Sequence, residues 1–197
     1  RKVLDGESMR DTIISMTKSV VDKFVSLCVS DEQPCTEWDL NELNQILLPV
    51  IPIQPVELTE SERVSRITKD QLVERLQKEA VEVYEKKERE FPDAEQIREL
   101  ERVVLLKVID KKWMDHIDDM DQLRQGIGMQ AYAQKNPLVE YKMYGYDMFG
   151  EMTREITVET VRLLFHVKIE QKVEREEVAK VTGTNKDDSL TKAPKTR

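Results

Sequence analysis

The fold is decided by residues 94–125, which have the sequence AEQIRELERVVLLKVIDKKWMDHIDDMDQLRQ. This stretch contains no glycine and no proline, the two residues that most often end a helix. Apolar residues recur along it every seven positions, with a second apolar set between them. The first set is Leu106, Trp113, Met120 and Ile127, and the second set is Ile109, Ile117 and Leu123. At 1.5 Å per residue, the pattern predicts an amphipathic helix about 48 Å long.

A second long helix is predicted after a short connection. Gly126 and Gly128 are expected to interrupt the first helix, and Asn136-Pro137 has the pattern of an N-cap followed by a first-turn proline. The predicted apolar stripe of the second helix is Leu138, Tyr141, Met148, Met152, Ile156, Leu163 and Val167. Two long amphipathic helices joined by about ten residues form an antiparallel helical hairpin.

The N-terminal half predicts one further long helix and then shorter ones. From Gly6 to about residue 30, apolar residues spaced by three or four predict a helix of about six turns. Thr36, Thr59 and Thr68 each precede an acidic or amide residue by three positions, which is the capping-box pattern of a helix start. The fold class is therefore all-α: a long-helix scaffold with a small inserted helical subdomain and a long antiparallel helical hairpin.

Composition excludes several classes of function. Charged residues make up 36% of the 197 residues and the net charge is −8, so nucleic acid is a poor partner for the whole molecule. No apolar run approaches the ~18 residues of a membrane span, and the N-terminus is not a signal peptide. The first residue is Arg1 rather than Met, which favours a piece of a longer protein. The cytoplasm is the expected compartment. From Thr182 to Arg197 the polar composition favours disorder.

No motif in the sequence predicts bound nucleotide or catalysis. The six glycines form neither a GxxxxGK[ST] nor a GxGxxG loop, and no Ser, Cys or Thr lies in the motif of an activated nucleophile. Cys28 and Cys35 are seven residues apart, which matches no zinc or redox CxxC motif, so they are expected to be free thiols. No catalytic residue and no cofactor is therefore assigned to this chain.

An acidic cluster on the first hairpin helix is the best metal candidate. His116 and Asp119 are one helical turn apart, close enough to share a cation. The preferred interpretation is a solvated acidic face with a partly packed histidine, because charged side chains are mostly exposed in proteins. His166, near the end of the second helix, has weaker acidic neighbours still. No metal ligand is assigned.

The turn of the hairpin carries the candidate contact residues. Tyr132 is flanked by alanines and glutamines at the end of a projection, where little core exists to bury its ring. An exposed aromatic ring of this kind is an adaptable contact for another chain, and the alternative is that Tyr132 folds back onto the helix ends. The candidate contact residues are Tyr132, Met129, Gln130, Gln134 and Lys135.

The hairpin sequence resembles that of the SecA family, the bacterial ATPases that drive preproteins through the SecY channel. The pattern Trp-x-x-His-x-x-x-Met-Asp-x-Leu-Arg-x-Gly-Ile begins at Trp113, and Tyr-x-Gln-x-x-Pro begins at Tyr132. The resemblance makes Trp113, His116, Met120, Leu123, Arg124 and Gly126 scaffold residues of a two-helix finger. It also implies that residues 1–30 end the long scaffold helix, 31–100 form the helical wing, 101–170 form scaffold and finger, and 171–197 form a C-terminal linker.

The resemblance implies a role in protein export. In the family the finger tip enters the cytoplasmic mouth of the channel, where a tip tyrosine contacts the translocating polypeptide, and Tyr132 occupies that place. The implied partners are a SecY-type channel, preproteins and the motor domains of the same parent chain. ATP and Mg²⁺ belong to those motor domains, which these 197 residues lack, so the chain is not expected to be an enzyme by itself. The implied location is cytoplasmic, peripheral at the inner face of the cell membrane.

The tip departs from the family pattern at two positions, and two other interpretations remain open. Gly128 and Gln130 stand where relatives often carry His and Arg, so the tip is less basic and more flexible here. One alternative is a free-standing helical adaptor whose apolar stripes bind partner helices. The other is a metal-dependent hydrolase that uses His116 and its aspartates.

Overall fold

The computed structural model describes residues 9–130 and 136–167, with the backbone alone at 128–130. Within these ranges the chain is all-helical and contains no strand, as the sequence predicts. The predicted disordered stretch 182–197 lies outside the described residues. The helices are α1 (Arg10–Cys28), the 3-10 turn η1 (Cys35–Glu37), α2 (Leu40–Leu47), α3 (Glu60–Ser65), α4 (Lys69–Glu88), α5 (Ala94–Gln130) and α6 (Pro137–His166).

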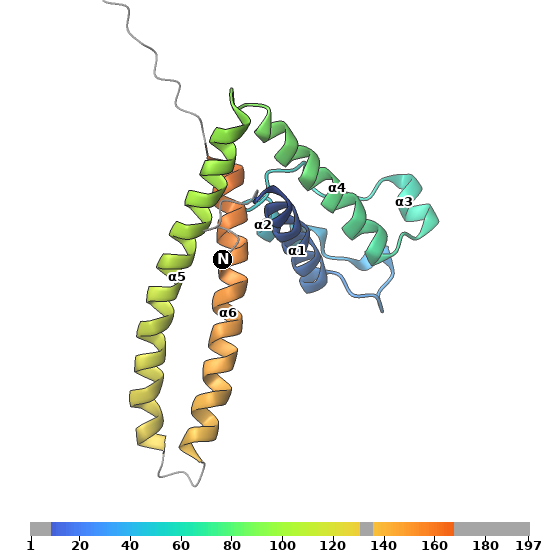
Figure 1. Cartoon of the computed structure of the whole chain (residues 1–197). Helices are drawn as coiled ribbons and strands as arrows, with labels where there is room; N and C mark the ends of the chain where they lie inside the picture. Colours follow the sequence, from blue (N-terminus) through green and yellow to red (C-terminus); the bar gives the residue numbers. More distant parts are fainter. Residues whose placement is uncertain (1–8, 131–135, 168–197) are drawn as a thin grey trace, which may run out of the picture.

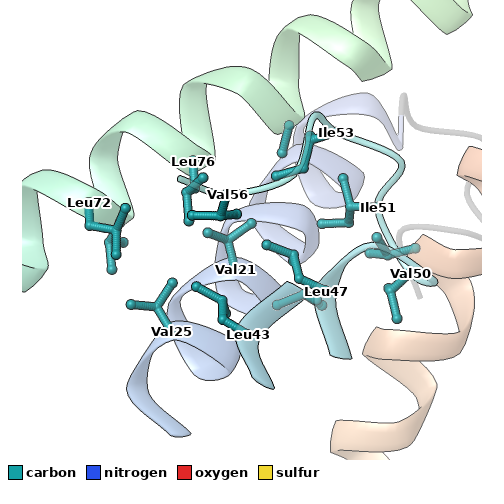
Figure 2. Packing of buried hydrophobic residues seen from close by; sticks show 14 of the residues in the cluster. Val21, Val25, Leu43, Leu47, Val50, Ile51, Ile53, Val56, Leu72 and Leu76 are labelled. Carbon is teal, nitrogen blue, oxygen red and sulfur yellow. The ribbon is translucent and has the colours of Figure 1, made fainter. Parts of the chain in front are cut away.

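The main hydrophobic core lies between α1, α2 and α4. Both α2 and α4 pack against α1, and the extended segment 49–58 covers the space between them. Figure 2 shows side chains from the three helices and this segment pointing toward one another. The labelled core residues are Val21, Val25, Leu43, Leu47, Val50, Ile51, Ile53, Val56, Leu72 and Leu76. The chain crosses between α2 and α3 as an extended connector because Pro49, Pro52 and Pro55 disfavour helix there.

The predicted helix starts are confirmed in two cases and wrong in one. Thr59 and Thr68 each accept a hydrogen bond from the backbone N–H three residues on, and both form complete capping boxes. Thr36 is not an N-cap. It lies in η1, and Asp39 caps α2 instead by accepting a hydrogen bond from the Glu42 N–H at 2.9 Å. The buried Trp38 holds this bend, since its indole N–H donates to the Gln33 carbonyl.

The hairpin of α5 and α6 is antiparallel and projects from this core. Figure 1 shows the two helices side by side along their length, with the core helices beside one end of the pair only. The C-terminal end of α6 joins the core through Val161, Leu164 and Phe165, which are all buried. The hairpin is therefore held at its base, and its other end extends beyond the core.

Candidate functional site

The contact between α5 and α6 has a defined register. The Lys112 ammonium lies 2.7 Å from a carboxylate oxygen of Glu155. Nearer the tip, a Cβ added to Gly145 would lie 3.0 Å from the terminal methyl carbon of Met120. Glycine at this position therefore lets the two helix backbones approach each other closely. The stretch that was predicted to double back does so as a closely paired hairpin.

The predicted apolar seam of α5 is wrong in part. The buried residues of α5 are Ile97, Glu101, Leu105, Val108 and Ile127. Trp113 and Ile117 were expected in the seam, but each leaves 47% of its surface exposed, and Leu106 is half-buried rather than buried. Ile127 is buried as predicted, and Ile109, Met120 and Leu123 are half-buried. Because α5 carries apolar residues around much of its circumference, spacing alone does not select the face that meets α6.

The predicted stripe of α6 is largely correct. Met152 is buried, and Tyr141, Met148, Ile156 and Val167 are half-buried. Leu138 and Leu163 are exposed instead. The helix begins where the sequence predicts, because the Asn136 side chain accepts a hydrogen bond from the Leu138 N–H at 3.0 Å.

Gly126 does not interrupt α5, which corrects the predicted helix end. The helix continues through Gly126 and Gly128 to Gln130. Glycine lowers helix stability by about 1 kcal/mol relative to alanine, which is too little to end a helix whose next turn is held by packing. The buried Ile127 supplies that packing. The connection between the helices is therefore shorter than predicted.

The predicted scaffold residues His116 and Arg124 lie in different environments. The His116 ring is half-buried between two other rings, with centroids 5.8 Å from Trp113 and 6.0 Å from Phe149 on α6. Arg124 is exposed and pairs with Asp121 at 2.5 Å on its own helix. The aromatic contact across the hairpin is one that sequence spacing did not predict, because Phe149 belongs to neither predicted stripe.

The contact residues at the tip lie at the limit of the described structure. Tyr132, Gln134 and Lys135 lie outside the described residues, and only the backbone of Met129 and Gln130 is described, in the last turn of α5. Their roles stay predictions. The end of α5 and the start of α6, which flank them, lie at the far end of the hairpin from the core (Figure 1).

An exposed apolar face is the feature of the hairpin that the sequence analysis missed. We use this name for a set of large apolar side chains that are exposed on both helices toward the tip. The members are Trp113, Met114 and Ile117 on α5, and Val139, Met143, Tyr146 and Phe149 on α6. Where such exposed apolar side chains adjoin one another, they commonly mark an interaction site. The sequence signal that could have indicated this face is that the apolar residues of α5 are too widely spread around the helix to fit a single buried stripe.

No metal centre is formed by the side chains that the structure describes. Among them, no three His, Cys, Asp or Glu lie close enough together to hold a metal ion, and His116 contacts aromatic rings rather than carboxylates. Asp115, Asp118 and Asp119 are exposed on the surface of α5. The exposure of these aspartates and the half-buried His116 ring agree with the predicted acidic face and partly packed histidine.

A groove of about 600 Å³ lies between α5 and α6 near the base of the hairpin. Its lining is Val104, Lys107, Val108, Lys111, Lys112, Glu159, Leu163, His166 and Val167. Two of its polar groups are already engaged, since Lys112 bonds Glu155 and Glu159 bonds Arg162. The groove presents no nucleophile beside a general base. Across the described residues, no helix is long and apolar enough to cross a membrane.

The fold and the hairpin define a class of protein: a helical scaffold that carries a projecting two-helix arm. Comparison with known proteins gives the family. The family model described as "SecA Wing and Scaffold domain" matches residues 1–168. The chain belongs to this SecA wing and scaffold family.

Similar proteins are SecA subunits from several bacteria. The protein translocase subunit SecA of Lachnoclostridium phytofermentans is 59% identical over 194 residues, which is 98% of this chain. The SecA subunit of Clostridium acetobutylicum is 45% identical over 188 residues, and SecA 1 of Alkaliphilus metalliredigens is 40% identical over 195 residues. The chain spans 22% of the length of each of these relatives.

Proposed function

We propose that this chain is the wing and scaffold part of a preprotein translocase subunit, and that its hairpin acts on the translocating polypeptide. Membership of the SecA wing and scaffold family, in a chain with a projecting antiparallel hairpin, is the observation that carries the proposal. In this assignment residues 31–100 are the wing, 1–30 and 101–170 are scaffold and finger, and 171–197 are the C-terminal linker. The finger tip enters the cytoplasmic mouth of a SecY-type channel.

The geometry of the hairpin suits an element that transmits force. α5 has 37 residues, which gives a length of about 55 Å at 1.5 Å per residue. Pairing along α6 stiffens it, and the buried base of α6 anchors it in the core. A tip that contacts many different preproteins needs a group that stacks on almost any side chain or backbone, and the Tyr132 ring has this property.

The remaining parts of the mechanism belong to the parent protein. ATP and Mg²⁺ bind motor domains outside these 197 residues, and the hairpin passes their movement to the polypeptide. Met129, Gln130, Gln134 and Lys135 surround Tyr132 in sequence and complete the proposed contact surface. The net charge of −8 gives no reason to include nucleic acid among the partners. The parent is placed in the cytoplasm and at the inner face of the cell membrane, as a peripheral protein.

In this proposal, another part of the parent protein covers the exposed apolar face of the hairpin. The motor domains of the same parent chain cover Trp113, Ile117 and their neighbours, so that the movement of the motor reaches the shaft of the hairpin directly. Apolar surface of this kind is removed from water when a partner packs on it, which stabilises the contact by about 25 cal/mol per Å² buried.

The test is translocation by the full-length parent protein carrying Tyr132→Ala, reconstituted with channel-containing vesicles and a labelled preprotein. Translocation is expected to fall several-fold, and Tyr132→Phe is expected to retain most of it because the ring remains. Tyr144→Ala, the same substitution on the shaft of α6, is the matched control and is expected to have little effect. Unchanged translocation by Tyr132→Ala would refute the tip contact.

The exposed apolar face also favours a second candidate, a free-standing helical adaptor that binds partner helices. The two candidates differ in the size of the cellular product. An antibody against the hairpin is expected to detect a polypeptide several times longer than 197 residues. A product of the size of this chain alone would favour the adaptor.

A further inference from the structure

The direction of the hairpin depends on a short connection between α4 and α5. α4 ends at Glu88 and α5 begins at Ala94, so residues 89–93 are the covalent link between them. α4 packs along α1, whereas α5 packs along α6. Figure 1 shows α4 and α5 leaving the connection in different directions. The angle between them must therefore be held by contacts close to the link.

A chain of ion pairs crosses this link. Arg98, in the second turn of α5, pairs with Glu88 at the end of α4 and with Glu101 on its own helix. Arg10 of α1 joins the same group. Its Nε lies 3.1 Å from Glu88 Oε1, and its Nη2 lies 3.1 Å from Glu85 Oε1. Side chains of three helices therefore meet around the connection.

The inner end of this network is sealed from solvent. The Tyr84 hydroxyl of α4 donates a hydrogen bond to Glu101 Oε1, and the two residues are 1% and 0% exposed. Burial raises the pKa of Tyr84, with the neighbouring Glu101 carboxylate adding to the effect, so the hydroxyl keeps its proton and remains a donor. The Tyr84 ring also lies 5.6 Å from the Phe165 ring, centroid to centroid, which brings α6 into the same contact.

The buried carboxylate is not explained by stability alone. The second oxygen of Glu101, Oε2, is buried and has no hydrogen-bond partner among the described residues. A buried ion pair often stabilises a protein no more than well-packed apolar residues of similar size would. Removing one partner of such a pair is much more costly, because a charge is left buried and unpaired. The pair therefore penalises every arrangement in which α4 and α5 shift relative to each other.

We propose that Tyr84, Glu88, Arg98 and Glu101 form a lock across the α4–α5 connection that fixes the direction of the hairpin relative to α4. Tyr84 and Glu101 are positioning residues in this arrangement. Arg98 links the buried pair to Glu88, and Arg10 ties the lock to α1. The inference goes beyond the proposed function, since it concerns the geometry of this chain and does not depend on what the hairpin tip contacts.

The test measures the angle across the connection by double electron–electron resonance. Spin labels are attached through Lys78→Cys on α4 and Asp118→Cys on α5, both at exposed positions, after Cys28→Ser and Cys35→Ala remove the native thiols. A second labelled pair, Asp118→Cys with Asp147→Cys on α6, measures the hairpin alone. The unmodified lock is expected to give one narrow distance for each pair.

Tyr84→Phe and Glu101→Gln are the test substitutions, since each removes one hydroxyl or one charge and keeps the shape of the side chain. The α4–α5 distance distribution is expected to become about twofold wider or to gain a second maximum, as a released hinge would give, while the hairpin distance stays unchanged. Glu99→Gln is the matched control. Glu99 is two positions from Glu101, and its exposed carboxylate pairs with Arg102. Neither the α4–α5 distance nor the hairpin distance is expected to change in this variant.

Two results would overturn the lock. One is an unchanged α4–α5 distance in both test variants with helix content preserved by circular dichroism. The other is equal widening of the α4–α5 and hairpin distances, which would indicate general loosening of the fold. Where the buried substitutions prevent folding, Arg98→Gln gives the answer, because the Arg98 side chain is 25% exposed and its charge pairs with Glu88 across the connection. It is expected to widen the α4–α5 distance alone, and an unchanged distance would overturn the lock.

Discussion

The Lys112 ammonium on α5 lies 2.7 Å from the Glu155 carboxylate on α6, although 43 positions separate the two residues in the sequence. This ion pair marks which turn of α5 faces which turn of α6. It lies beside the groove near the base of the hairpin, which Lys112 also lines. A slip of one helix past the other by a single turn would break it.

The first prediction concerns the strength of this pair. A double-mutant cycle with Lys112→Met and Glu155→Gln is expected to give a coupling energy of about 0.5 kcal/mol, because the Glu155 side chain is half exposed and solvent screens the interaction. The measurement is urea unfolding of the four proteins. High salt is expected to reduce the coupling, and a coupling that is the same at low and high salt would contradict a direct ion pair between Lys112 and Glu155.

The same pair predicts a loss of stability at alkaline pH. The hydrogen bond from Lys112 to Glu155 raises the pKa of the Lys112 ammonium above its usual value. A raised pKa in the folded state stabilises the protein fully below the unfolded-state pKa of about 10.4, and this contribution disappears as the pH rises through the folded-state pKa. In Lys112→Met, the free energy of unfolding is expected to fall less as the pH rises, because the contribution of the Lys112 ammonium is absent. Unfolding curves from about pH 8 to about pH 11 measure it, with Lys78→Met as the exposed control.

The continuation of α5 through Gly126 predicts a stabilising substitution. No atom lies within 4 Å of a Cβ added at this position, so Gly126→Ala is expected to increase the free energy of unfolding by up to about 1 kcal/mol. Gly145→Ala is expected to gain less, because its Cβ would press on the Met120 methyl group. Thermal unfolding compares the two. Destabilisation by Gly126→Ala would mean that the helix ends at Gly126 in a left-handed conformation.

The exposed face predicts a difference between the two tryptophans. Trp113 is half exposed, whereas Trp38 is buried in the core. With Trp38→Phe, the remaining fluorescence is expected to be red-shifted and several-fold more sensitive to acrylamide quenching than the fluorescence that remains with Trp113→Phe. In the full-length parent, quenching of Trp113 is expected to fall. Equal quenching of Trp113 in the chain and in the parent would contradict the proposed cover over this face.

The core predicts a large effect of one leucine and a small effect of another. Leu43 of α2 is 0% exposed, so Leu43→Ala is expected to lower the free energy of unfolding by about 2–5 kcal/mol through a cavity and lost burial. Leu27 of α1 is 68% exposed, and Leu27→Ala is expected to change it by less than about 0.5 kcal/mol. Denaturant unfolding of both variants is the measurement. Equal losses would contradict the placement of the core between α1, α2 and α4.

Helix starts were the part of the fold that local sequence predicted best. Thr59, Thr68 and Asn136 act within a few residues of themselves, so their hydrogen bonds depend little on the rest of the chain. Thr36 failed because its segment is held by a contact outside the local pattern: burial of Trp38 and its bond to Gln33 move the helix start to Asp39. The candidate tip residues remain predictions, since Tyr132 lies outside the described residues.

The sequence by itself determined that the chain is helical, where most helices begin, and that two long helices form a hairpin, because propensity, capping and periodicity act over one or two turns. The tertiary structure decided which faces of those helices meet. The spacing placed Trp113 in the seam and left Leu105 out, yet Trp113 is half exposed and Leu105 is buried, since the partner helix and the core select a face. Only the folded chain brings Tyr84 to Glu101 and Lys112 to Glu155, because those contacts join residues that no local pattern connects.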